Sequence, residues 1–193
     1  VVFRTESGDS HSLADNWVTV LHEDARGRLW VGSRGGLQWF DPVTQSFHAP
    51  DGWDEAAPRA GARQVQALVE DSRGGLWVGT GDGLLRLDAE GRRLNGWRHD
   101  PASADGLPSS HVQALAWDLN GRLWVGTAAG LVRAEDDGAH FEPFTLLEAP
   151  ENEPTHEGVL ALRMARDGKL WIGSDFGLQR WDLSQGRPER RRF

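Results

Sequence analysis

The sequence predicts an all-β protein, a β-propeller built from four blades of 47 residues, each blade a sheet of four antiparallel strands. The motif Leu-Trp-Val-Gly, with Ile for Val in its last copy, occurs four times at a constant spacing of 47 residues. The chain has 24 glycines in 193 residues, which suits many tight turns, and no stretch keeps the apolar period of a long helix. A fixed period of about 40–50 residues is typical of arrays whose units bury their faces against their neighbours.

Each repeat divides into four short strands joined by turns. In the first repeat we expect them at 18–23, 29–33, 37–41 and 45–48. The first strand has the mixed apolar pattern of a strand that is covered on both faces. Gly27 marks the turn after it, and Gly36 marks the next turn. The fourth strand is the most variable and recurs near 94–98 and 140–144.

The repeated positions are interpreted as structural. The motif tryptophans, which we expect in the core between blades, are Trp30, Trp77, Trp124 and Trp171. The glycine two residues after each of them leaves room for a neighbouring side chain, and the glycine of each Gly-Leu pair, such as Gly36, is expected at positive φ. In the first turn Asp24, Asp71 and Asp118 are expected to accept backbone N–H groups. Ala165 takes their place in the fourth repeat.

We expect one propeller domain over residues 1–193. Its blades are expected at about 6–52, 53–99, 100–146 and 147–193. Within the 47-residue repeat, residues 1–5 lie at the position of a fourth strand, and so do the C-terminal residues 191–193. Either end could therefore supply an outer strand that closes the ring. Three arrangements fit this pattern: a four-bladed ring, half of an eight-bladed dimer, or a segment of a larger propeller.

Composition argues against several classes of protein and site. The apolar fraction of 38% and the charged fraction of 26% are those of a soluble globular domain, and the net charge of −8 argues against a nucleic-acid partner. No apolar run is long enough to cross a bilayer, so we expect no membrane contact by this segment itself and see no targeting signal in it. Without cysteine, and with seven histidines that lack ligand spacing, the sequence predicts no metal site and no cofactor. Common catalytic motifs are missing, so no catalytic residue is assigned.

Binding residues are expected where the repeats differ, on the loops at the mouth of the central channel. The candidates are Trp17, Gln64 and His111, which begin first strands, and Arg34, Asp82, Asp175 and Phe176, which lie in turns between second and third strands. The loops between blades add His11, Trp53 and His156. Aromatic faces together with Gln, His, Asp and Arg suit a polar, ring-containing ligand such as an oligosaccharide.

The unit V-x-x-L-x-x-D-x-x-G-x-L-W-V-G-T-x-x-G-L-x-x-x-D, clearest at 65–88, resembles the two-component regulator propeller repeat. The linker at 98–107 and the stretch at 10–18 are similar to the segments that precede a blade in that family. The resemblance covers nearly the whole chain. It implies the periplasmic or extracellular sensor part of a bacterial membrane receptor with a histidine kinase or diguanylate cyclase output, and well-known members sense oligosaccharides.

Three hypotheses about function follow. The first is a non-catalytic propeller that senses a ligand or acts as a scaffold in such a receptor, with an oligosaccharide or another small polar molecule as its partner. The second is a propeller-type lyase, since antibiotic-inactivating lyases are propellers in which a Gly-x-x-Trp motif also recurs. A lyase would need a base at the channel mouth, for which His111 or His156 is the candidate. The third is a structural propeller whose partner is a second copy of itself or further blades.

Overall fold

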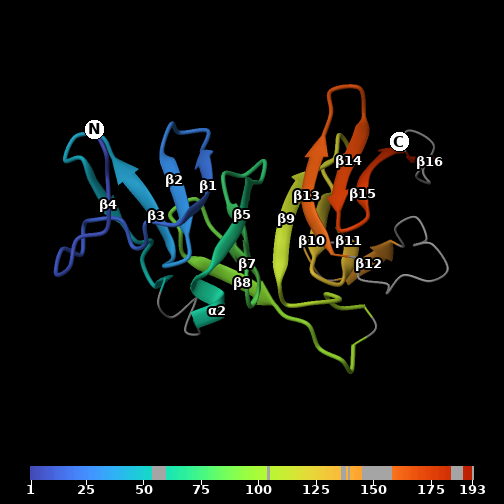
Figure 1. Cartoon of the computed structure of the whole chain (residues 1–193), viewed down its shortest axis with the longest axis horizontal. Helices are drawn as coiled ribbons and strands as arrows, with labels where there is room; N and C mark the ends of the chain where they lie inside the picture. Colours follow the sequence, from blue (N-terminus) through green and yellow to red (C-terminus); the bar gives the residue numbers. More distant parts are fainter. Residues whose placement is uncertain are drawn as a thin grey trace. The chain divides into compact units, whose positions relative to one another are not determined.

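A computed structural model describes residues 1–53, 60–103, 105–135, 138, 140–144, 158–183 and 189–192. The chain divides into two compact units, Val1–Gly96 and Trp97–Phe193, and each is described by itself. The described residues form four antiparallel sheets of four strands, as expected of propeller blades, and each sheet falls within one of the four expected blade ranges (Figure 1).

The first unit holds two of these sheets. The first sheet runs in the order β1 (Val18–Glu23), β2 (Leu29–Ser33), β3 (Leu37–Asp41) and β4 (Ser46–His48). The second sheet runs in the order β5 (Val65–Glu70), β6 (Leu76–Thr80), β7 (Gly83–Leu87) and β8 (Arg93–Trp97). A single short helix, α2 (Ala60–Arg63), precedes β5 in the part of the unit that is described. The first three strands of the first repeat begin and end where the sequence predicts.

The second unit repeats the arrangement. The third sheet consists of β9 (Val112–Trp117), β10 (Leu123–Thr127), β11 (Gly130–Glu135) and β12 (His140–Phe144). The fourth consists of β13 (Val159–Met164), β14 (Lys169–Ser174), β15 (Gly177–Asp182) and β16 (Glu189–Arg192). The first strands β1, β5 and β13 each carry an irregularity next to their first valine, which lies opposite the end of the motif strand.

The motif tryptophan of one sheet packs against the next sheet of the same unit. Trp30 joins Val65, Leu68 and Leu76 of the second sheet in one core cluster. In the second unit Trp124 packs in the same way with Leu170, Ile172 and Trp181 of the fourth sheet. Both Trp30 and Trp124 are only 1% exposed. Burial of a whole indole stabilises each contact between sheets by about 2–3 kcal/mol.

Trp171 departs from this pattern. The sequence predicts it in the core, but its side chain is only half-buried, and the guanidinium carbon of Arg180 lies 5.7 Å from the centre of its ring. A motif tryptophan faces the following sheet, and no sheet follows the fourth one within the described residues of the second unit. The prediction of a core residue is therefore wrong at Trp171, whereas Trp77, like Trp30 and Trp124, is 1% exposed.

The expected outer strand at residues 1–5 is wrong, because the structure assigns these residues to no strand. The ring of Phe3 instead packs edge-on against Phe40 and Phe47 of the first sheet, with ring centres 5.1 and 5.3 Å apart. The place of an outer strand beside β15 is taken by β16, which the C-terminal end of the chain supplies.

None of the helices in the described part of the chain is long and apolar enough to cross a membrane.

Candidate functional site

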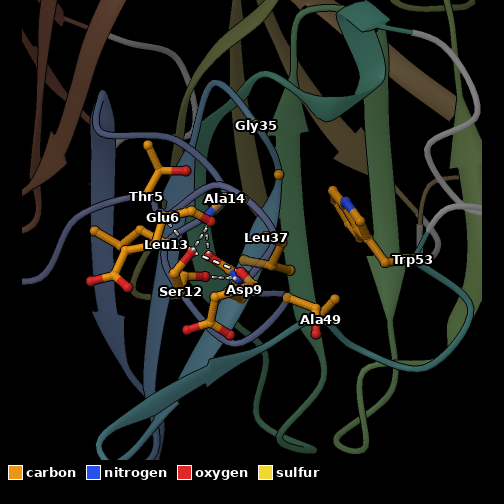
Figure 2. Close-up of a pocket in the computed structure, with 13 residues that line it drawn as sticks. Thr5, Glu6, Asp9, Ser12, Leu13, Ala14, Gly35, Leu37, Ala49 and Trp53 are labelled. Carbon is orange, nitrogen blue, oxygen red and sulfur yellow. Dashed lines mark hydrogen bonds between the residues drawn. The ribbon is translucent and has the colours of Figure 1, made fainter.

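A cavity of about 290 Å³ lies at one edge of the first sheet, entirely within the first unit (Figure 2). Three segments line it: the N-terminal residues 5–14, the turn and strand start from Gly35 to Gln38, and the residues Ala49 and Trp53 that follow β4. In the view of Figure 2 the indole of Trp53 stands across from Glu6, Asp9 and Ser12. The cavity therefore combines an apolar wall with a polar rim.

Gln38 ties the N-terminal segment to β3. Its side chain is 5% exposed and makes two hydrogen bonds to that segment. The Ala14 N–H donates to Gln38 Oε1 at 2.8 Å, and Gln38 Nε2 donates to the Ser12 carbonyl at 3.0 Å. A buried amide with both ends paired holds its partners in place, since leaving either end unpaired would cost about 1–3 kcal/mol. Gln38 therefore fixes one wall of the cavity.

The rim is a compact turn that is stabilised by its own side chains. Ser12 Oγ accepts the Glu6 N–H at 2.9 Å and donates to the Asp9 carbonyl at 2.9 Å. Asp9 Oδ1 accepts the His11 N–H at 2.8 Å, while the His11 Nδ1 lies 3.8 Å from the same oxygen. These bonds leave Asp9 Oδ2 and the Glu6 carboxylate without a hydrogen bond among the described residues. Both carboxylates are exposed on the rim and can accept hydrogen bonds from a bound molecule.

Trp53 supplies the apolar wall and one donor. Its side chain is 5% exposed, and its indole N–H has no hydrogen-bond partner among the described residues. The N–H lies against Gly36, which also lines the cavity: a Cβ added to Gly36 would lie 2.9 Å from Trp53 Nε1. Gly36 is at φ 149°, as predicted for this turn. A buried N–H without an acceptor is costly, so an oxygen atom that reached it would recover about 1–3 kcal/mol.

This set of groups suits a small polar molecule. Carboxylates and hydroxyls on the rim accept hydrogen bonds, and the indole N–H donates one. The volume lies at the lower end of ligand pockets, which span about 300–1,000 Å³, and therefore fits one small ring. No group of three or more His, Asp or Glu among the described residues is arranged to hold a metal ion.

A hydrogen bond that recurs in all four sheets involves five of the seven residues predicted from the sequence. In each sheet the residue after the motif strand donates its N–H to the carbonyl of the residue that precedes the first strand. The pairs, with N–O distances of 3.0–3.2 Å, are Arg34 with Trp17, Gly81 with Gln64, Ala128 with His111 and Asp175 with Gly158. The predicted loops thus lie at the same end of the strands in every sheet.

In the first unit the pair Trp17 and Arg34 also interacts through its side chains. The guanidinium carbon of Arg34 lies 3.9 Å from the centre of the Trp17 ring, which is 59% exposed. Asp82 begins the corresponding turn of the second sheet, where its N–H donates to Thr80 Oγ1 at 3.1 Å, and Gln64 is exposed beside it. Neither Trp17 nor Arg34 lines the cavity, although Gly35, the residue after Arg34, does.

In the second unit His111, Asp175 and Phe176 lie at the same edge of their sheets. His111 is half-buried, and its N–H is held by Ser109 Oγ at 3.1 Å. Asp175 is exposed and Phe176 half-buried in the turn between β14 and β15. His156 lies outside the described residues. That the seven candidates form one channel-mouth site stays a prediction.

Sequence reasoning missed Gln38, Glu6 and Asp9. The position of Gln38 holds Leu85 in the second repeat, Val132 in the third and Gln179 in the fourth, so glutamine at this position did not by itself mark the cavity. Nothing in the repeat pattern marked the N-terminal residues, which precede the first full repeat.

The fold and the cavity together define a class: a protein of propeller repeats with a small polar pocket beside its first sheet. Three segments of this chain, residues 12–35, 61–82 and 106–129, match the model of the two component regulator propeller repeat. The fourth repeat, in which Ala165 replaces the turn aspartate, lies beyond these matches. A search of curated proteins gives no significant match.

Solved structures with the same fold include extracellular domains of two proteins from B. thetaiotaomicron that are described as hybrid two component systems. The chain matches the BT3049 domain with a TM-score of 0.75 and 24% identity, over 100% of this chain and 24% of that one. It matches the BT4673 domain with a TM-score of 0.73 and 20% identity, over 97% of this chain and 26% of that one. The chain thus spans about a quarter of the length of these two extracellular domains, and at this identity the likeness shows the fold.

A third similar structure is an enzyme. Virginiamycin B lyase from Staphylococcus aureus matches with a TM-score of 0.65 and 15% identity, over 93% of this chain and 57% of that one. The structure is of a catalytically inactive variant in which a histidine is replaced by alanine. The propeller fold alone therefore does not separate a sensor from a lyase.

Proposed function

We propose that this chain is a non-catalytic, ligand-sensing part of the extracytoplasmic region of a bacterial signal-transduction receptor. The observation that carries the proposal is the match of three repeats to the two component regulator propeller. The likeness to extracellular domains of hybrid two component systems supports it. The pocket of the first unit supplies a place for a ligand.

The location can be tested in the bacterium that makes the protein. Intact cells, cells with a permeabilised outer membrane and lysed cells are treated with protease, and the chain is followed with an antibody. We expect the chain to be digested either in intact cells or in cells whose outer membrane has been permeabilised. Protection until the inner membrane is broken would place the chain in the cytoplasm and overturn the extracytoplasmic assignment.

We propose further that the cavity takes one sugar ring of an oligosaccharide. A sugar hydroxyl is both donor and acceptor, so it can donate to the Glu6 or Asp9 carboxylate while a second hydroxyl oxygen accepts the Trp53 N–H. The parts of Leu13 and Trp53 that line the cavity suit the C–H faces of a sugar ring.

Calorimetric titration with a panel of oligosaccharides tests this assignment. For an oligosaccharide that binds, Trp53→Phe should weaken binding about threefold to tenfold, because it removes one neutral hydrogen bond and keeps an aromatic ring. Trp17→Phe is the matched control, since Trp17 is exposed and does not line the cavity. Thermal unfolding of both variants reports whether they remain folded. Weaker binding by Trp17→Phe alone would move the site to the predicted channel mouth.

A lyase is the second candidate, and the specific observation in its favour is the structural similarity to virginiamycin B lyase. The ring of His111, one of the two candidate bases with His156, makes no hydrogen bond to any described residue, so no described neighbour orients it for proton transfer. Incubation with virginiamycin B, followed by chromatography, tests this function. Consumption of the antibiotic that His111→Ala abolishes would establish the enzyme and contradict the non-catalytic proposal.

A further inference from the structure

The cavity of the first unit is acidic. Of the charged side chains that line it, Glu6 and Asp9 are both carboxylates, and no basic side chain is among the lining residues. His11, which adjoins the lining residues Ser10 and Ser12, has its Nδ1 atom 3.8 Å from Asp9 Oδ1. The Glu6 carboxylate and Asp9 Oδ2 therefore keep acceptor capacity that no described residue uses.

A second feature, independent of the carboxylates, also points to a bound molecule. The Trp53 indole N–H is buried without an acceptor among the described residues, on the wall that faces the rim and against the Gly36 backbone. A ligand oxygen that reached this N–H would satisfy it. Because the rim already carries two negative charges, that oxygen is better supplied by a neutral hydroxyl than by an anionic group such as a carboxylate or phosphate.

We infer that the cavity selects an amino sugar, a sugar ring that carries a protonated amine. The ammonium group donates to the Glu6 and Asp9 carboxylates, and a ring hydroxyl oxygen accepts the hydrogen bond of Trp53. Charge-assisted hydrogen bonds to the ammonium are stronger than those that a neutral hydroxyl makes at the same place. This inference rests on the proposed function, in which the cavity binds a sugar ring, and adds the charge that distinguishes one class of sugar from the others.

The geometry of the rim supports this selection. The turn that carries both carboxylates is held by the hydrogen bonds of Ser12 and by the Gln38 side chain. Its carboxylates therefore approach a ligand from a fixed turn, and little conformational entropy is lost on binding. Because both carboxylates are exposed, the attraction should weaken as salt screens it.

Paired titrations with D-glucosamine and D-galactosamine against glucose and galactose test the inference. N-acetylglucosamine serves as a third ligand, because it keeps the nitrogen but not the charge. We expect each amino sugar to bind about tenfold more tightly than its neutral parent and the preference to shrink at high salt. Equal affinity for charged and neutral sugars would overturn the inference and leave the proposed function intact. If none of these five sugars binds, the inference is overturned, and the oligosaccharide panel alone decides the proposed function.

Variants of the rim separate charge from shape. Glu6→Gln and Asp9→Asn keep the size of the side chains, and the amide oxygen that Asp9→Asn introduces can still accept the His11 N–H. Each should reduce the preference for the amino sugar about threefold while leaving the affinity for glucose nearly unchanged. Glu23→Gln, an exposed change at the end of β1 outside the cavity, is the matched control and should keep the preference. A preference that survives in the double variant Glu6→Gln/Asp9→Asn would show that these carboxylates do not carry it.

Discussion

At the scale of single residues, the turn between the first two strands of a sheet is organised by one buried carboxylate. Asp118 Oδ1 accepts the N–H groups of Asn120 and Arg122, and its Oδ2 accepts from Arg122 Nε at 2.7 Å and from Trp124 Nε1 at 3.2 Å. Asp24 makes the same set of contacts in the first sheet. The carboxylate thus links the turn to the motif tryptophan, which is the main core residue of the sheet.

Removing this carboxylate should destabilise the protein. Asp118→Ala leaves the Trp124 indole N–H, the guanidinium of Arg122 and two backbone N–H groups without their acceptor, so we expect the free energy of unfolding to fall by about 2–3 kcal/mol. Urea unfolding followed by tryptophan fluorescence measures this change.

The fourth sheet provides the control for that measurement. Ala165 stands in place of the aspartate there, and Asp167, two residues later, pairs with the amine of Lys169 at 2.8 Å on the surface. Asp167→Ala should therefore leave the free energy of unfolding nearly unchanged. Equal losses for the two variants would mean that the buried contacts of Asp118 do not matter.

The roles of repeated residues were predictable from the sequence, and those of unique residues mostly were not. Three in-phase copies of this aspartate identify Asp24 and Asp118 as turn carboxylates, and the structure confirms that they accept backbone N–H groups. The indole bond of each was not foreseen, because spacing does not show which way a side chain points. Trp53 was noted only as a loop aromatic, since its burial comes from Gly36 and from core residues such as Trp30, which belong to the preceding repeat.

At the scale of strands and sheets, neighbouring sheets interlock through a valine and a glycine. A Cβ added to Gly126 in β10 would lie 2.5 Å from Val159 Cγ1 in β13, too close for any side chain. The same contact joins Gly32 of β2 to Val65 of β5, at 2.6 Å. The glycine two residues after the motif tryptophan therefore leaves room for the next sheet, as the sequence predicts.

Filling that space should separate the sheets of the second unit. Gly126→Ala forces Val159 or the β13 backbone to move, and we expect a loss of about 1–3 kcal/mol in the free energy of unfolding. Gly173→Ala in β14 is the matched change, because its nearest neighbour, Ala161 Cβ, is at an ordinary 3.4 Å, and it should change stability by less than about 0.5 kcal/mol.

A double-mutant cycle identifies the contact. In the background of Val159→Ala, Gly126→Ala should cost less than it does in the wild type, because the nearest atom, the Cγ1 methyl, is gone. Part of the cost should remain, because the Cβ of residue 159 stays 2.9 Å from the added methyl group. The same cost in both backgrounds would assign the loss to the strand itself rather than to the interlock.

The strands were predictable because their signals are local. Glycine at the turns and the apolar phase within each repeat fix where β1, β2 and β3 begin and end. The N-terminal segment was predicted wrongly as a strand because its position within the 47-residue repeat does not show which strand, if any, it pairs with. In the structure Phe3 packs against the rings of Phe40 and Phe47 rather than entering a sheet.

At the scale of the whole molecule, each unit has its own core, and the acid sensitivity of the protein is shared between them. Burial tends to raise the pKa of Asp24 in the first unit and of Asp118 in the second. The hydrogen bonds from backbone N–H groups, from the indoles and from Arg28 or Arg122 outweigh it and hold the pKa of both carboxyls below their ordinary value of 3.8. The number of copies in the assembly and the closure of the ring stay predictions.

These depressed pKa values predict how the whole protein responds to acid. In the unfolded chain the two carboxyls take up protons near pH 3.8, whereas in the folded chain they do so only at lower pH. The unfolded state therefore binds more protons in that range, so the contribution of both groups is fully present above about pH 5 and is lost as the pH falls through their folded pKa values. Urea midpoints measured from about pH 6 down to about pH 2.5 should be level at first and then fall. The double variant Asp24→Ala/Asp118→Ala should start lower and fall less steeply, because Asp41, Asp88 and Asp167, whose pKa values are also lowered, still respond to acid. An equally steep fall in the double variant would show that these two turn carboxylates do not make the protein acid-sensitive.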